Sequence, residues 1–265
     1  MPPVFFLHIM KTAGTSVTQL LRTVYHPDEV YPEASNVNEK TGINRLITLE
    51  PKRRSQLRLY SVHMPAWVAD TVGTEFVRAT VLREPVERTI SHLAHIARAL
   101  DMSIEDIYAD ENWRNRLANY QTRILTLRRA VFEASQAAWE TRLRELAATG
   151  VTAPPSDDLA KQHRNEIRHQ YSALTVMPEA EPLAEADLER AMAVVDGFDV
   201  VGLTSELESF QHRLSAHMGL ELPPIPVRNR APHQHDLSDS LRTSVEQDQQ
   251  LDLQLFEHVR RTLTT

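Results

Sequence analysis

The segment VFFLHIMKTAGTSVTQLL, residues 4–21, constrains the fold more than any other part of this chain. Its apolar run Val4–Ile9 ends abruptly in the polar loop Lys11–Ser16. A continuous run of branched and aromatic residues is typical of a strand buried on both faces, as in a parallel sheet. After the loop, apolar residues return at the spacing of one helical face: Val17, Leu20, Leu21 and Val24. The segment therefore predicts a strand, a tight loop and a helix.

The same alternation continues along the chain. Apolar runs predict further strands over 57–62, 76–82 and 198–203. Helical periodicity predicts helices from Pro85, over 183–195, from 205 to near Gly219, and over 239–263. Residues 27–56 have the composition of loop and short helix, and residues 104–180 of a mostly helical segment. Strands that alternate with helices favour an α/β fold with a parallel sheet and right-handed crossovers.

Composition excludes several classes of function. The 265 residues carry a net charge of −7, which argues against nucleic acid as a partner. No cysteine is present, so disulfides and thiolate chemistry are excluded. No apolar stretch reaches the roughly 18 residues of a membrane span, so we expect no integral membrane segment. Without a recognisable signal sequence at its start, the chain is expected to be cytoplasmic.

Three predicted strands run into residues with useful chemistry. The first leads to Lys11, the second to His63 and the third to Arg83. In open parallel sheets, ligands bind beyond the carboxyl ends of the strands. If these strands are parallel, all three side chains should point into one crevice.

The first loop has the features of an anion site. Gly14 permits close approach to the backbone, and the amides of residues 12–16 together with the helix start attract negative charge. The hydroxyls of Thr12, Thr15 and Ser16 add donors, and Lys11 adds a charge. Thr15 or Ser16 is also expected to cap the following helix. The alternative is a tight turn with an exposed lysine.

Arg83 and Ser91 form a second candidate anion site. Arg83 precedes a helix that starts at Pro85, and Ser91 lies on its second turn, so both can reach one phosphate. The alternative is an ion pair between Arg83 and a neighbouring glutamate, Glu84 or Glu87.

His63 is a candidate general base, because imidazole exchanges protons near neutral pH. The alternative is a histidine with a structural hydrogen bond. His92 and His95 lie three residues apart on a predicted helix, but no third ligand accompanies them. We therefore predict no metal site.

These motifs resemble those of a known family. FLHIMKTAGTSV, residues 6–17, resembles the 5′-phosphosulfate loop of sulfotransferases that use 3′-phosphoadenosine 5′-phosphosulfate (PAPS). VLREPVERTISHL, residues 81–93, resembles their 3′-phosphate segment. SVHMPAW, NYQTRIL, FDVVGLTSELESF and LDLQLFEHV resemble the carbohydrate subgroup that includes heparan 2-O-type enzymes. Met10 stands where relatives usually have proline, and Val62 where many have glycine.

The resemblance implies a fold and an activity. The fold would be a P-loop-like three-layer αβα sandwich in a single domain, residues 1–265, with a helical insertion around 104–180 beside the acceptor. The activity would be transfer of a sulfuryl group from PAPS to an acceptor hydroxyl, without a metal. An excess of arginine over lysine favours a bacterial source. Neither the acceptor nor the oligomeric state can be read from the sequence.

The resemblance also implies residue roles. Lys11 would stabilise the leaving phosphate and His63 would act as the base. Residues Thr12, Ala13, Gly14, Thr15 and Ser16 would bind the 5′-phosphate. Arg83 and Ser91 would bind the 3′-phosphate. Arg228, Asn229 and Arg230 lie in a late loop that closes over the cofactor in relatives; the alternative is a solvated basic turn. Asn119, Gln121 and Thr122 would line the acceptor cleft or form a polar helix face.

Two other classes compete with this interpretation. A P-loop kinase or nucleotide hydrolase requires GxxxxGK[ST], with the lysine after the last glycine, whereas here Lys11 precedes Gly14. A non-catalytic nucleotide-binding protein could keep the same fold without transferring any group.

Overall fold

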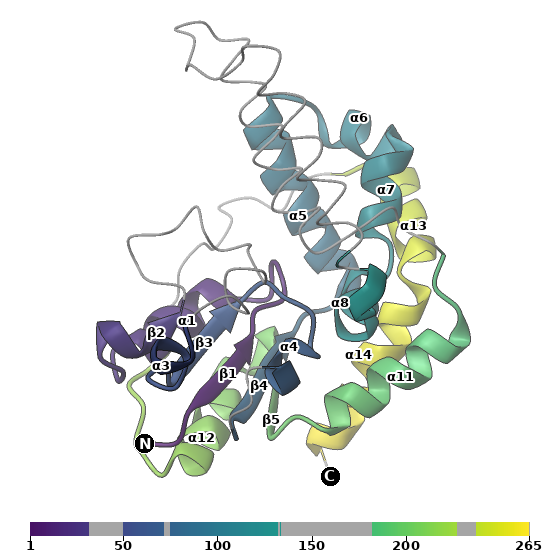
Figure 1. The fold of residues 1–265 in the computed structure, drawn as a ribbon. Coiled ribbons are helices and arrows are strands. Elements are labelled where there is room, and N and C mark those ends of the chain that lie inside the picture. Colours follow the sequence, from purple (N-terminus) through teal and green to yellow (C-terminus); the bar gives the residue numbers. More distant parts are fainter. Residues whose placement is uncertain (32–49, 72–74, 132, 134–181, 227–236, 265) are drawn as a thin grey trace, which may run out of the picture.

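A computed structural model describes residues 1–265 except 32–49, 72–74, 132, 134–181, 227–236 and 265. Its centre is a five-stranded sheet in the order β2-β3-β1-β4-β5, in which every pair of neighbours is parallel (Figure 1). The strands are β1 (Val4–Leu7), β2 (Val30–Tyr31), β3 (Leu59–Val62), β4 (Val77–Leu82) and β5 (Val200–Leu203). The predicted α/β fold with a central parallel sheet is confirmed.

The edge strand β2 was not expected, because residues 27–56 have the composition of loop and short helix. It has only two residues, and both pair with β3. Two residues are too few to produce a periodic pattern, although both side chains are buried. The sequence-based interpretation of this segment is therefore wrong at Val30–Tyr31.

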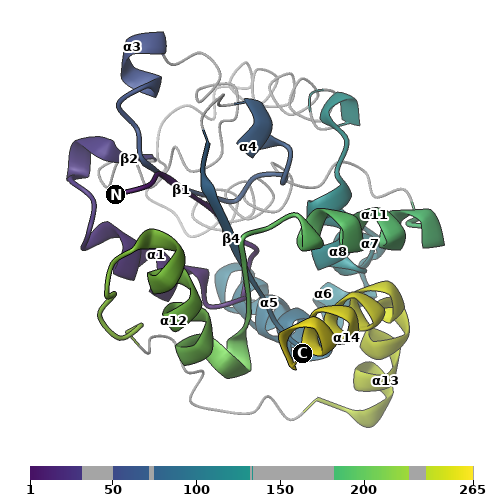
Figure 2. The same ribbon diagram turned by 90° about the horizontal axis from the view of Figure 1, so that it is seen from below.

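Alternate side chains of β1 point into two separate hydrophobic cores. Val4 and Phe6 join the core under α1 (Gly14–Arg22) and α12 (Leu207–Met218). Phe5 and Leu7 join the core under α4 (Val68–Thr71), α8 (Tyr120–Thr126), α11 (Glu185–Asp196) and α14 (Gln250–Thr264). Figure 2, in which the molecule is seen from below, shows α1 and α12 on one side of the sheet and α11 and α14 on the other. These two helical layers and the sheet form the expected three-layer αβα arrangement.

The second layer, and the helices that pack beside it, come from distant parts of the chain. They are α4 (Val68–Thr71), α5 (Pro85–Leu100), α6 (Ile104–Ala109), α7 (Glu111–Leu117), α8 (Tyr120–Thr126), α11 (Glu185–Asp196), α13 (Asp239–Asp248) and α14 (Gln250–Thr264). The short helix α3 (Pro51–Arg54) and the 3₁₀ turns Pro27–Glu29 and Thr204–Glu206 complete the described elements. The single terminal helix predicted over 239–263 is therefore two helices.

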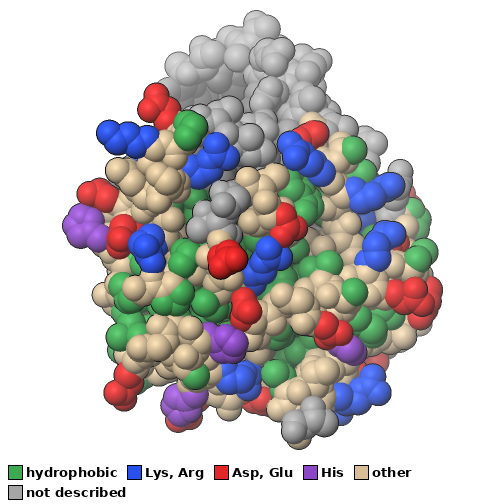
Figure 3. Space-filling view, turned by 60° about the horizontal axis from the view of Figure 1, so that its bottom comes forward, with side chains coloured by type: hydrophobic (Ala, Val, Ile, Leu, Met, Phe, Trp, Pro, Cys, Tyr) green, Lys and Arg blue, Asp and Glu red, His purple; other side chains and the backbone are tan. Residues whose placement is uncertain are grey.

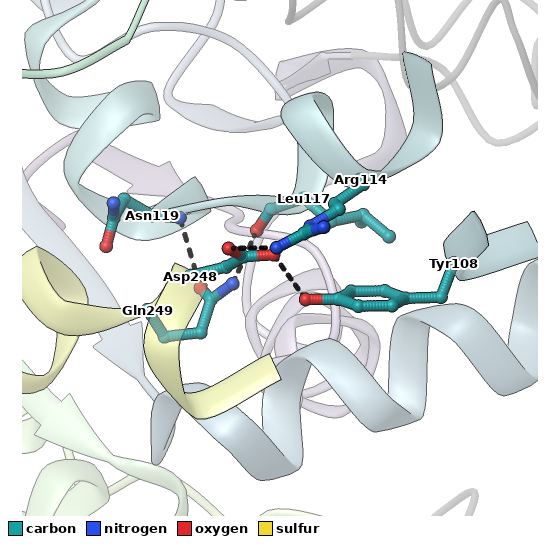
Figure 4. Close-up of polar contacts among 6 residues, drawn as sticks. All are labelled: Tyr108, Arg114, Leu117, Asn119, Asp248 and Gln249. Carbon is teal, nitrogen blue, oxygen red and sulfur yellow. Dashed lines mark hydrogen bonds and ion pairs between the residues drawn. The ribbon is translucent and has the colours of Figure 1, made fainter. Parts of the chain in front are cut away.

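A third core joins α5, α6, α7 and α13, and polar contacts reinforce it (Figure 4). Asp248, at the end of α13, accepts a hydrogen bond from the Tyr108 hydroxyl. The same carboxylate pairs with Arg114, whose Nε lies 2.6 Å from Oδ2. This arrangement fixes the C-terminal part of the chain against the segment that follows α5.

The amino ends of α8 and α14 cap one another. Asn119 Oδ1 accepts hydrogen bonds from the amides of Leu251 (2.9 Å) and Asp252 (3.1 Å). The Asp252 carboxylate accepts from the amides of Gln121 (2.9 Å) and Thr122 (2.7 Å). The first amides of a helix have no acceptor within it, so each helix supplies what the other lacks.

The face at the amino ends of the strands has mixed charge. Figure 3 shows this face with acidic and basic side chains interspersed among scattered hydrophobic ones. The cations described below lie at the opposite, carboxyl end of the sheet, where Figure 1 shows β1, β3 and β4 directed toward α5.

The reciprocal cap predicts an order of stability. Asn119 has φ 47°, a left-handed conformation that Asn tolerates better than Ala. Asn119→Gly removes the hydrogen bonds to the amides of α14 without backbone strain, and we expect it to lower the free energy of unfolding by about 1 kcal/mol. Asn119→Ala adds the left-handed strain, for a total of about 2 kcal/mol. Urea unfolding measures both variants; an alanine variant at least as stable as the glycine variant would contradict this account.

Candidate active site

The three candidate side chains follow three neighbouring strands. β1 lies between β3 and β4, and Lys11, His63 and Arg83 follow the carboxyl ends of β1, β3 and β4. The chain passes from β1 toward the β2 edge, returns through β3, and then crosses to β4 on the other side of β1. The site therefore lies where the strand order reverses, the usual ligand position in such sheets.

The loop after β1 has an unusual backbone. Lys11 and Ala13 both have positive φ, 69° and 62°, in the left-handed region that favours glycine. Such conformations cost roughly 1–2 kcal/mol each and tend to occur at functional sites. Thr12, between them, is fully buried, and its hydroxyl donates to the Ile9 carbonyl at 2.9 Å. This hydroxyl, expected to be a ligand donor, therefore closes the loop.

The start of α1 differs from the prediction. Its N-cap residue is Ala13 and no side chain caps the helix, so the expected cap from Thr15 or Ser16 is wrong. The Ser16 amide donates to the Ala13 carbonyl at 2.9 Å. The amides of Gly14 and Thr15 are the first two of the helix, so no carbonyl within the helix can accept a hydrogen bond from them. Thr15 is exposed and Ser16 is buried.

Lys11 and Arg83 are brought together. Arg83 Nη1 donates to the Lys11 carbonyl oxygen at 3.4 Å, which ties the end of β4 to the loop after β1. Burial is the largest cause that lowers the pKa of Lys11 to about 8, followed by the charges of Arg98, Arg83 and Arg88. Clustered cations of this kind favour an anionic ligand.

The glutamates beside Arg83 have other partners. Glu84 caps α5, accepting from the amides of Val86 (3.2 Å) and Glu87 (2.7 Å). Glu87 pairs with Arg242 at 2.8 Å. Among the described residues, the ion pairs do not include one between Arg83 and either glutamate, which was the alternative to phosphate binding. Burial lowers the pKa of Arg83, while the two glutamates act in the opposite direction.

Ser91, the other predicted 3′-phosphate residue, is half-buried on the second turn of α5. Arg88, on the same helix, was not singled out from the sequence. It is fully buried, lies 4.4 Å from the Tyr120 ring centroid, and donates to Thr89 Oγ1 at 2.9 Å. Burial lowers the pKa of Arg88 to about 10. Arg88 therefore adds a buried positive charge, which contributes to lowering the pKa of Lys11.

His63 is held by the loop after β1. Its Nδ1 lies 2.7 Å from the His8 carbonyl oxygen. A carbonyl only accepts, so Nδ1 carries the proton and, in the neutral ring, Nε2 carries the lone pair. The rings of His63 and His8 also contact each other, with centroids 3.9 Å apart. His8 was missed because the apolar run predicted a strand to Ile9, whereas β1 ends at Leu7.

Gly14 is required by His8. A Cβ added at Gly14 would lie 1.8 Å from Cδ2 of the His8 ring. We expected a ligand to approach the backbone of Gly14 closely, but the His8 ring does so. The absence of a Cβ at Gly14 therefore allows His8 to pack against the amino end of α1.

Asn119, which precedes α8, and Gln121 and Thr122, which lie on it, make contacts within the protein. Gln121 and Thr122 are fully buried, and Asn119 caps α14. The Gln121 amide side chain contacts the Arg83 backbone. Both side chains are closed off from solvent, so the expectation that Gln121 and Thr122 line an open cleft is wrong. Arg228, Asn229 and Arg230 lie outside the described residues.

The described residues lack two other kinds of feature. Within them, no three histidine, aspartate or glutamate side chains are grouped to hold a metal ion. Across the same residues, none of the helices combines the length and hydrophobicity needed to cross a bilayer.

Comparison with known families defines the class of protein. A model of the sulfotransferase family matches residues 2–258, which is nearly the whole chain. The chain therefore belongs to the sulfotransferase family, whose P-loop-like fold agrees with the parallel sheet and flanking helices described above. A search of curated proteins returned no significant match.

The contact between Gly14 and His8 predicts a pair of coupled substitutions. Gly14→Ala should lower the free energy of unfolding by about 1–3 kcal/mol, because the new methyl group overlaps the His8 ring. When His8→Ala is already present, the same change should cost less than about 0.5 kcal/mol. Urea unfolding of the double-mutant cycle measures the coupling, and equal costs in the two backgrounds would contradict the packing described.

Proposed function

We propose that the chain transfers a sulfuryl group from PAPS to the hydroxyl of an acceptor. The observation that carries this proposal is the pairing of Lys11 with Arg83 at the ends of adjacent parallel strands. Lys11 is the first residue of the polar loop before α1, and Arg83 precedes α5, so the two side chains can contact separate phosphates of one nucleotide. Membership of the sulfotransferase family supports the reaction class.

Lys11 is the group that stabilises the leaving phosphate. As the bond between sulfur and the bridging oxygen breaks, negative charge develops on the 5′-phosphate. The Lys11 ammonium, the amides of Gly14 and Thr15 and the amino end of α1 supply a preorganised positive field for that charge. Ala13, Thr12 and Ser16 shape this loop, with Thr12 acting through its bond to Ile9.

Arg83 and Ser91 bind the 3′-phosphate. The partial burial of Arg83 strengthens a charge-assisted hydrogen bond to an anion. Arg228, Asn229 and Arg230 are proposed to contact the cofactor from the late loop, on the sequence resemblance alone.

His63 is the base. The protonated Nδ1 bonded to His8 leaves Nε2 as the atom that accepts the proton of the acceptor hydroxyl. The acceptor oxygen then forms its bond to sulfur while the bond to the phosphate oxygen breaks, and adenosine 3′,5′-bisphosphate leaves. We propose a carbohydrate, glycolipid or small metabolite as the acceptor, with part of its cleft formed by residues 104–180.

Transfer itself tests the proposal. Purified protein incubated with sulfur-35-labelled PAPS and a panel of carbohydrate, lipid and small-molecule extracts should yield a labelled, acceptor-dependent product. His63→Ala should lower kcat ~100-fold or more while the Kd for adenosine 3′,5′-bisphosphate changes less than ~3-fold.

His258→Ala serves as the matched control, since His258 pairs with Asp196 between α14 and α11 and should not alter turnover. Absence of labelled product with any acceptor would contradict the proposed activity. A His63 variant that loses affinity rather than turnover would make His63 a binding residue.

The pKa of Lys11 predicts a pH dependence. Its ammonium is charged below about pH 8 and loses its proton above it, so kcat/KM for PAPS should fall as pH rises through about 8. Lys11→Arg keeps the charge at all these pH values, and the decline should disappear even if the rate is lower. An unchanged decline in the arginine variant would assign it to another group.

A further inference from the structure

The structure assigns to Gln121 the role of a positioning residue that holds Arg83 toward the 3′-phosphate. This inference rests on the proposed function, because it concerns the geometry of the same binding site. Sequence reasoning placed Gln121 in the acceptor cleft or on a polar helix face; its contacts indicate a different role.

The side-chain amide of Gln121 bonds both backbone groups of Arg83. Oε1 accepts from the Arg83 amide at 3.0 Å, and Nε2 donates to the Arg83 carbonyl at 2.9 Å. β4 ends at Leu82 and α5 begins at Pro85, so Arg83 lies in the link between them. The amide of Gln121 thus makes the two bonds that a neighbouring strand would make, and it does so in a fully buried position.

Gln121 is itself held from behind. Its backbone amide donates to Asp252 Oδ2 at 2.9 Å, and the amide of Thr122 donates to Oδ1 at 2.7 Å. Asp252 is fully buried on α14, whose own first amides are capped by Asn119. The C-terminal helix therefore fixes α8, and α8 fixes the backbone of Arg83.

The fixed backbone sets the point from which the Arg83 side chain extends. Arg83 Nη1 reaches the Lys11 carbonyl oxygen, so the side chain extends from β4 across to the loop after β1. Loss of the Gln121 bonds would free the link between β4 and α5, and Arg83 would spend less time in that direction. The hydrogen bonds of Gln121 go to Arg83 and Asp252 and not to the Lys11 loop, so binding of the 5′-phosphate by that loop should be little changed.

The test compares two nucleotides that differ only in the 3′-phosphate. Calorimetry gives the Kd values of adenosine 3′,5′-bisphosphate and adenosine 5′-monophosphate for the full chain. In the wild type the bisphosphate should bind at least about 10-fold more tightly, as expected for a charge-assisted bond. In Gln121→Leu this ratio should fall at least ~3-fold, with the monophosphate Kd changed less than ~2-fold.

Gln249→Leu is the matched control. Gln249, between α13 and α14, also makes two side-chain bonds to backbone groups: it accepts from the Asn119 amide and donates to the Leu117 carbonyl, both at 3.1 Å (Figure 4). It should lower thermal stability as Gln121→Leu does, yet keep the wild-type ratio. If Gln121→Leu does not fold, Gln121→Met keeps the length of the side chain, removes both bonds without adding a charge, and its ratio should fall in the same way.

The outcomes separate the two proposals. A wild type that binds neither nucleotide contradicts the proposed function. If the wild type prefers the bisphosphate and the Gln121 variant keeps the same preference, the positioning role is overturned while the proposed function stands. Equal loss in the Gln121 and Gln249 variants also overturns it, since the effect would then be general loosening of α8.

Discussion

Arg83 and Lys11 are tied to each other by a hydrogen bond from the Arg83 guanidinium to the Lys11 carbonyl. The bond is possible because β1 and β4 are adjacent and parallel, so their carboxyl ends meet at one edge. Most other features of the site depend on this arrangement. Lys11 and Ala13 adopt left-handed conformations in the loop after β1, α1 starts at the end of this loop, and His63 contacts the same loop from the end of β3.

Electrostatics makes this arrangement costly in the absence of an anion. Burial and three neighbouring arginines lower the pKa of Lys11 to about 8, and burial lowers the pKa of Arg88 to about 10 although the Asp252 charge acts in the opposite direction. A ligand with two phosphates would relieve the repulsion, and any ligand that binds only the folded state stabilises it. The reciprocal caps of α8 and α14 and the Gln121 contact supply the rigidity that holds the cations in place.

Much of the fold follows from sequence pattern, because buried parallel strands are continuous apolar runs. The runs before Lys11, His63 and Arg83 each predict a strand that the structure contains, although β1 ends two residues early. The edge strand Val30–Tyr31 is too short to give a pattern. His8 is hidden within an apolar run. The role of Gln121 depends on contacts with residues 38 and 131 positions away, which no local signal encodes. Polar residues on short helices are therefore the least predictable part of the site.

Phosphorus-31 NMR of bound adenosine 3′,5′-bisphosphate tests most directly whether Lys11 and Arg83 serve separate phosphates. In the wild type, both phosphorus resonances should shift on binding. Arg83→Ala should abolish chiefly the shift of the 3′-phosphate, and Lys11→Ala chiefly that of the 5′-phosphate. Shifts that are absent in the wild type, or that both substitutions reduce equally, would contradict a site built from two strand ends with one phosphate at each.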